Sequence, residues 1–174
     1  RAFEGLGRDA EAYKVLTETC ELYPQEFRPW LELAVLAHRK GLAAEVRRAA
    51  REVLARKPER ETVLALFQLM YTDRDAMPLL EGLGARYAGD AEVRAHLAHA
   101  YAQQRRWFTA ARLFEEAVAL GGGYAFEAAD QYRMAGRYRH ALRMNGLAPK
   151  TTSQRVQRVA ILFEQEQYAR IVAM

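Results

Sequence analysis

The chain has 174 residues, of which 51% are hydrophobic and 28% are charged, a balance typical of a folded chain and not of a disordered one. No apolar run approaches the 18 or more residues that cross a bilayer as a helix, so no membrane-spanning helix is expected. A single cysteine, Cys20, excludes an internal disulfide, and the formal net charge of +4 directs attention to where the basic residues lie.

Ala, Leu, Arg and Glu dominate the composition and prolines number five, which favours helix because these residues lose little side-chain freedom in one. No segment alternates between apolar and polar residues with period two for any length, so strands are not expected. The pattern predicts helices over residues 9–21, 26–40, 43–56, 60–71, 76–88, 91–104, 107–119, 124–135, 138–144 and 153–165, with a last one beginning near residue 168. Because Arg1 opens the sequence without Met and an apolar helical pattern closes it, we interpret the chain as a fragment of a longer one.

A repeating pattern runs through the sequence. Pro24 and Pro58 lie 34 residues apart, and between them come Trp30, then Leu33-Ala34, then Gly41 at a bend. The same frame recurs twice further along the chain, with Leu97-Ala98, Tyr101, Trp107, Ala110 and Phe114 in one copy and with Tyr132, Gly136, Tyr138 and Ala141 in the next. A period of this length indicates stacked helical hairpins, because one hairpin cannot bury both of its apolar faces alone.

These residues resemble the tetratricopeptide repeat (TPR) family over essentially the whole chain. The resemblance implies an all-α fold, an α-solenoid of helix-turn-helix repeats that forms a right-handed superhelix. The copies are predicted at residues 1–24 (partial, with a bend at Gly7), 25–58, 59–90, 91–121, 122–150 and 151–174 (partial, with Leu162, Tyr168 and Ile171). The third copy departs from the pattern through a bend about four residues short, and the fifth through a second helix expected to end early at Asn145-Gly146.

The position of each residue in the repeat predicts its role in packing. We expect small residues where two helices approach within roughly 8 to 10 Å; these are Ala34, Ala98, Ala110 and Ala141. Large residues are expected to fill the remaining space, namely Trp30, Tyr101, Phe114 and Tyr132.

Candidate catalytic and metal sites are weak. Glu115 and Glu116 are adjacent on a helix and point in different directions, and His96 and His99 lack a third ligand at a suitable spacing. Cys20 has no histidine in its own repeat and is interpreted as a buried, inert thiol. The segment "GLAPKTT" (146–152) lacks the glycine before the lysine of a phosphate-binding loop and follows a helix. We therefore expect no enzyme activity, no cofactor and no metal.

Positive charge is concentrated toward the C-terminal end of the sequence. From Gln131 to Phe163 there are seven basic residues and no acidic one: Arg133, Arg137, Arg139, Arg143, Lys150, Arg155 and Arg158. Such a patch could neutralise phosphates, and solenoids of paired helices read RNA with one base per repeat. A reader of that kind needs a regular polar pair in every copy, whereas the comparable residues here are Arg39, Gln103 and Arg133. A nucleic-acid binder is therefore the alternative and not the leading hypothesis.

The leading hypothesis is protein binding. TPR arrays present the first helix of each pair on a concave wall, where partners bind. The matching positions here are Arg28, Leu31, Val35, His38 and Arg39 in the second copy, Glu92, His99 and Gln103 in the fourth, and Phe126, Asp130 and Arg133 in the fifth. Leu31 and Val35 occupy two places of the Lys/Asn set with which some family members clamp a terminal carboxylate, so binding to chaperone C-termini is not expected.

The fifth copy and the residues after it, "DQYRMAGRYRHALRMNGLAPK" and "RVAILFEQEQYARIVAM", show a narrower resemblance. They resemble the periplasmic TPR region of the outer-membrane export proteins of Pel-type exopolysaccharide (biofilm) systems. This resemblance implies a periplasmic scaffold that docks a polysaccharide-modifying enzyme, a deacetylase or hydrolase, and that meets the membrane only through the rest of the chain. A TPR adaptor in another bacterial assembly is a further alternative.

Overall fold

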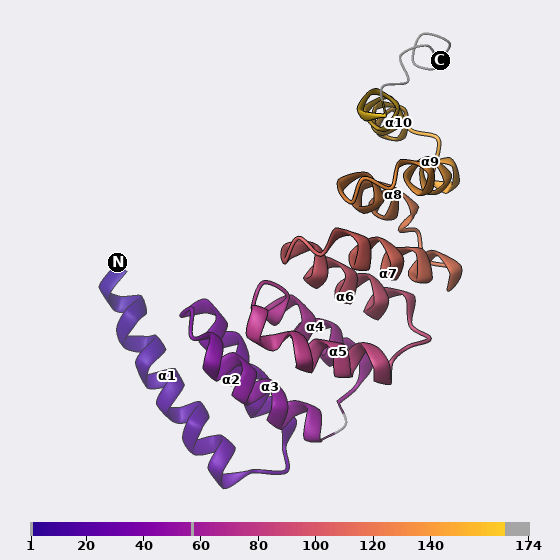
Figure 1. The fold of residues 1–174 in the computed structure, drawn as a ribbon. Coiled ribbons are helices and arrows are strands. Elements are labelled where there is room, and N and C mark those ends of the chain that lie inside the picture. The colour runs from indigo at the N-terminus through magenta and orange to yellow at the C-terminus, as the bar shows by residue number, and fades with distance from the viewer. Residues whose placement is uncertain (1, 57, 166–174) are drawn as a thin grey trace. The chain divides into compact units, whose positions relative to one another are not determined.

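The computed structural model describes residues 2–56 and 58–165, and all regular elements among them are helical (Figure 1). The elements are α1 (Ala2–Leu22), α2 (Phe27–Arg39), α3 (Ala43–Ala55), α4 (Arg60–Met70), a short 3-10 helix η1 (Arg74–Ala76), α5 (Met77–Arg86), α6 (Ala91–Gln103), α7 (Trp107–Ala119), α8 (Ala125–Met134), α9 (Tyr138–Leu147) and α10 (Thr152–Glu164). The all-α class predicted from the sequence is confirmed. The helix predicted near residue 168 lies outside the described residues. Within the described ranges, no helix combines the length and the apolar character needed to span a membrane.

Within each half of the chain, most helices that follow one another in sequence pack against one another, as expected for stacked hairpins. The chain forms two compact units, Arg1–Leu80 and Glu81–Met174. In the first unit α1 packs on α2, α2 on α3, and α3 on α4; in the second α6 packs on α7, α7 on α8, α8 on α9, and α9 on α10 (Figure 1). In addition α8 contacts α10, so two first helices meet directly in the second unit.

The core residues have the packing roles predicted for them. The small residues Ala34, Ala98, Ala110 and Ala141 are fully buried, at 0% exposure. Among the large residues, Tyr101, Phe114 and Tyr132 are buried, while Trp30 is half-buried against a cluster that includes Cys20, Leu33 and Ala34. Small residues thus permit the close approach of helices, and aromatic rings fill the spaces beside them.

The bends of the second, fourth and fifth copies share one backbone conformation. Gly41, Arg105 and Gly136 each lie two residues after a first helix, and their φ angles are 71°, 60° and 68°. The next residue closes the turn by donating a backbone hydrogen bond into the last turn of the helix, as Arg106 N does to Tyr101 O at 3.0 Å. Glycine tolerates positive φ without a Cβ clash, whereas Arg105 adopts it at an energetic cost.

The structure corrects the prediction for the N-terminal copy. A bend at Gly7 and a helix over residues 9–21 were expected, but α1 runs without interruption from Ala2 to Leu22. A glycine inside a helix costs only about 1 kcal/mol relative to alanine. Gly7 is therefore compatible with continued helix, and a glycine alone does not define a bend.

A second correction concerns the fifth copy, where α9 continues through Asn145-Gly146 to Leu147 and does not end at residue 144. Asn145 is fully buried, and its Nδ2 donates to Gln154 O and to Gln157 Oε1, both at 2.9 Å. Pro149 has no N–H to offer the Asn145 carbonyl four residues earlier, and Gln154 Nε2 donates to that carbonyl at 2.9 Å. The helix ends at Leu147 because Ala148, which precedes the proline, is held in an extended conformation.

The irregular bend of the third copy contains η1. The Asp73 carboxylate accepts a hydrogen bond from Asp75 N at 3.0 Å, which caps this short helix. Arg47 on α3 forms an ion pair with Asp73 and lies 3.5 Å from Asp75. The shortened bend is thus fixed by local capping and by a guanidinium from the preceding helix.

Candidate functional site

A groove of about 420 Å³ lies between α8 and α10 in the second unit. It is lined by Phe126, Asp130 and Arg133 from α8 and by Thr152, Ser153, Val156, Gln157 and Ala160 from α10. The three α8 residues are spaced four and three apart, so they share one face of that helix. They are the three positions that the sequence predicted for the concave wall of the fifth copy. We call this site the α8–α10 groove.

One wall of the α8–α10 groove is a charged triad. Arg133 Nη2 lies 2.8 Å from Asp130 Oδ1 on its own helix, and Arg133 Nη1 lies 2.6 Å from Glu164 Oε1 on α10. The arginine side chain is only 22% exposed, which limits its contact with water. This guanidinium therefore connects the two helices and fixes the width of the groove at one end.

The floor of the groove is held by Gln157, which is 7% exposed. Its Nε2 donates to the Phe126 carbonyl at 2.9 Å, and its Oε1 accepts from Asn145 Nδ2 at 2.9 Å. One side chain on α10 thus bonds to α8 and to α9. A buried polar group with both ends satisfied stabilises a defined arrangement of its neighbours.

Apolar surface is exposed beside the charged wall. Val156 is 63% exposed, and Phe126 and Ala160 are half-buried. A smaller hollow of about 250 Å³ shares Phe126 and Ser153 with the groove and continues toward Pro149. The accessible surface therefore combines an apolar strip, two hydroxyl side chains in the first turn of α10 and an ion-paired rim.

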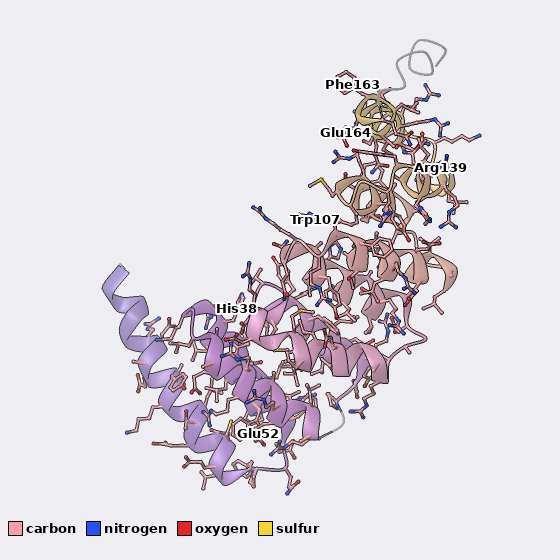
Figure 2. All side chains as sticks on the ribbon, in the orientation of Figure 1. His38, Glu52, Trp107, Arg139, Phe163 and Glu164 are labelled. Carbon is pink, nitrogen blue, oxygen red and sulfur yellow. The ribbon has the colours of Figure 1, made fainter. Side chains whose placement is uncertain are left out.

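The other predicted wall residues do not line the α8–α10 groove. On α2, Arg28, His38 and Arg39 are exposed and Leu31 and Val35 are half-buried. His38, which is labelled in Figure 2, lines a separate hollow of about 180 Å³ with Thr72 and Asp73 in the first unit.

The predicted wall residues on α6 also lie elsewhere. Glu92 is half-buried and Gln103 is exposed. The His99 ring packs edge-on against Phe114, with centroids 4.9 Å apart. Loss of solvation lowers the pKa of His99, and the charge of His96 adds to this effect.

The seven basic residues are distributed over α8, the bend before α9, α9, the loop after it and α10. Arg133 is ion-paired as described, and Arg143 Nη2 lies 2.5 Å from Glu115 Oε1. Arg139, Lys150 and Arg155 are exposed and Arg158 is half-buried, while Arg137 lies over the Phe108 ring at 5.5 Å. In Figure 2, Arg139 and Glu164, the partner of Arg133, lie at opposite edges of this part of the molecule. Two of the seven cations are therefore neutralised by neighbouring helices.

In residues 8–56 and 58–165, whose side chains are described, no three His, Cys, Asp or Glu side chains are placed to share a metal ion. Cys20 is 1% exposed, and burial raises the pKa of its thiol, which disfavours the reactive thiolate.

Sequence reasoning missed the α10 half of the groove. Helix 153–165 was predicted as the first helix of the last copy, and the wall positions could have been assigned on it in the same way. The spacing of the apolar residues Val156 and Ala160, four positions apart on one face of this helix, could have indicated that this face lines the groove. The hydrogen-bonded role of Gln157 had no such signal, because it depends on the register between α9 and α10.

No protein-family model and no curated protein matches the sequence. Among solved structures, the chain is similar to TTC0263, a thermophilic TPR protein of Thermus thermophilus, with 21% identity over 93% of this chain and 94% of that one and a TM-score of 0.51. It is also similar to a tetratricopeptide repeat protein from Parabacteroides merdae, with 16% identity over 97% of this chain and 70% of that one and a TM-score of 0.53. The chain therefore has a TPR fold, as predicted; at these identities the likeness concerns the fold alone.

Proposed function

We propose that this TPR-fold chain is a non-catalytic scaffold for protein–protein interactions and that the α8–α10 groove binds an extended segment of a protein partner. The observation that supports this proposal is the meeting of α8 and α10, two first helices, around a groove of about 420 Å³ with exposed apolar surface. A site of this volume accommodates one or two side chains of a bound segment.

The chemistry of the groove suits a polypeptide. Val156 and Phe126 offer apolar contact, while the Thr152 and Ser153 hydroxyls can donate to or accept from a peptide backbone. The Arg133–Asp130 pair presents both charges at the rim, where it can select among partner side chains. An extended segment, whose successive side chains point to opposite sides, would use the apolar strip and the polar rim together.

For the partner, we propose a periplasmic polysaccharide-modifying enzyme, a deacetylase or hydrolase, in bacterial exopolysaccharide export and biofilm formation. The chain would then be periplasmic, as part of an outer-membrane protein. The support for this assignment is the resemblance of residues 130–150 and 158–174 to Pel-type export proteins.

A pull-down at low salt tests both levels of the proposal. The intact chain is immobilised and offered the purified modifying enzyme encoded with the same export system. The wild type should retain the enzyme, and Val156→Glu should lose at least tenfold in affinity because it places a charge on the apolar strip. Val15→Glu is the matched control, since Val15 on α1 is also exposed, at 54%.

The outcomes separate the alternatives. Retention by the wild type and by Val156→Glu alike would contradict the groove as the docking site. Absence of retention by the wild type would contradict the export assignment. Binding of single-stranded RNA that weakens steeply with salt would favour the nucleic-acid alternative instead.

A further inference from the structure

A second pocket, of about 410 Å³, lies on a different surface of the second unit. It is built from α7, α8 and α9 and shares no lining residue with the α8–α10 groove. Its aromatic side chains are Phe108, Tyr132 and His140. The Phe108 and Tyr132 rings meet edge-on at 6.2 Å, and the Tyr132 and His140 rings lie 5.2 Å apart.

The charges of this pocket are unbalanced. Arg112, Arg137 and Arg143 line it together with one carboxylate, Glu115. Glu115 is already satisfied, because it accepts hydrogen bonds from Arg143 Nη2 at 2.5 Å and from the Tyr132 hydroxyl. Three guanidinium groups and one carboxylate leave a formal charge of +2 around the cavity before any protonation of His140.

Arg112 and Arg137 carry this excess charge. Among the side chains that the structure describes, those of residues 8–56 and 58–165, neither forms an ion pair with an acidic group, and both are exposed at the pocket. Arg137 instead lies over the Phe108 ring, with its guanidinium carbon 5.5 Å from the ring centroid. A guanidinium held over an aromatic face by a cation–π contact keeps its charge, because the ring supplies no counter-ion.

From these observations we infer that the Arg112–Arg137 pocket binds a carboxylate side chain of an acidic segment in a protein partner. Planar guanidinium groups match the two oxygens of a carboxylate, and such charge-assisted hydrogen bonds are about twice as strong as neutral ones. Two other donors of this pocket, Arg143 and the Tyr132 hydroxyl, already bind the carboxylate of Glu115. Phe108, which is 46% exposed, adds apolar surface for a residue beside the acidic one.

The probe is a blocked pentapeptide, acetyl-Gly-Phe-Glu-Glu-Gly-amide, whose carboxylates all come from glutamate side chains. It is titrated into the intact chain while the arginine Nε–Hε signals are followed by NMR. The signals of Arg112 and Arg137 should shift in a saturable manner, and the matching Gln-Gln peptide should bind at least tenfold more weakly.

Paired variants locate the site. Arg112→Gln with Arg137→Gln should weaken the Glu-Glu peptide at least tenfold. Lys150→Gln with Arg155→Gln removes the same charge from exposed positions outside the pocket and should leave affinity within twofold. Far-ultraviolet circular dichroism of each variant confirms that the helices persist.

Three results would overturn the inference. One is the absence of a saturable shift at Arg112 and Arg137. Another is equal weakening by the two paired variants, which would mean that net charge alone attracts the peptide. The last is inorganic phosphate binding as tightly as the Glu-Glu peptide, which would assign the pocket to a simple oxyanion. The α8–α10 groove is untouched by these variants, so the two proposals succeed or fail separately.

Discussion

Tyr132 on α8 donates a hydrogen bond from its phenolic hydroxyl to the Glu115 carboxylate on α7. The same relationship occurs one copy earlier, where Tyr101 on α6 donates to Glu81 on α5. In both cases a buried aromatic ring of a first helix reaches back to the preceding second helix. The tyrosines expected as space-filling residues therefore also connect neighbouring copies through a charge-assisted hydrogen bond.

Each partner affects the ionisation of the other. Burial and the hydrogen bond to Glu115 raise the pKa of Tyr132 above its ordinary value of 10.0. Burial alone would also raise the pKa of Glu115, but the hydrogen bonds from Tyr132 and Arg143 outweigh it and hold that pKa below 4.5. The neutral phenol and the ionised carboxylate are thus the forms that the fold favours.

Tyr132→Phe should lower the free energy of unfolding by about 1–2 kcal/mol at pH 7, because it removes a hydrogen bond to a charged group. The loss should be constant between about pH 5 and pH 9. The stability that ionised Glu115 contributes is present above pH 4.5 and is lost as the pH falls through the lower pKa that Glu115 has in the folded state. The stability that neutral Tyr132 contributes is complete below pH 10.0 and is lost as the pH rises through the higher pKa that Tyr132 has in the folded state. Urea unfolding from about pH 3 to pH 9 checks this, with exposed Tyr23→Phe as control; a difference that does not shrink in acid would contradict the assignment.

Arg105→Gly should raise the free energy of unfolding by about 0.5–1.5 kcal/mol, since it relieves a left-handed backbone conformation at φ 60°. The gain is limited by the greater freedom of glycine in the unfolded chain. Gly136→Ala, at the equivalent bend with φ 68°, is the reciprocal variant and should lose about 1 kcal/mol. Thermal unfolding of both measures the effect, and a decrease in Arg105→Gly would refute the equivalence of the two bends.

Asn145→Ala should destabilise the fold by about 2–4 kcal/mol, because it leaves Gln154 Nε2 and Gln157 Oε1 without this partner. Backbone amides of α10 should lose protection in hydrogen exchange, since Asn145 connects α9 to that helix. Replacing both Asn145 and Gln157 by leucine should cost less than the sum of the two single leucine variants. Additive losses would show that the two side chains are energetically independent.

The sequence predicts those features of the structure that neighbouring residues determine, and it does not predict those that depend on contacts with a distant helix. The helices, the buried alanines and the positions of Gly41 and Gly136 follow from periodicity and backbone preference, and the structure confirms their roles. Gly7 and Asn145 have the local preferences of bends, yet both lie within helices. For Asn145 the deciding interaction comes from α10, which no local preference encodes.

The inter-copy pairs were also not predictable from spacing. Tyr132 and Glu115 are 17 residues apart and Tyr101 and Glu81 are 20 apart, because Tyr101 lies further from the start of α6 than Tyr132 does from the start of α8. A search at one fixed separation therefore cannot find both pairs. Likewise the α8 half of the groove follows from the repeat frame, whereas its closure by Glu164 depends on where α10 is placed.

Trp30→Ala should cost about 3–5 kcal/mol through the cavity that it leaves beside Cys20, Leu33 and Ala34. Arg48 and Arg56 lie 5.7 and 5.6 Å from the centroid of the indole ring and would lose that contact as well. Trp30→Phe, which keeps an aromatic ring, should cost less than half as much. An unchanged melting temperature in Trp30→Ala would contradict the packing role of this residue.

Site-specific photo-crosslinking at Val156 tests the central claim most directly. A benzoylphenylalanine placed there projects from the exposed apolar strip of the α8–α10 groove, and the same residue at Val15 on α1 serves as control. With the polysaccharide-modifying enzyme that we propose as the partner present, we predict a crosslinked adduct from position 156 that disappears when Arg133 is also changed to glutamate, and none from position 15. Crosslinking at position 15 but not at position 156 would contradict the proposal that the groove is a docking surface.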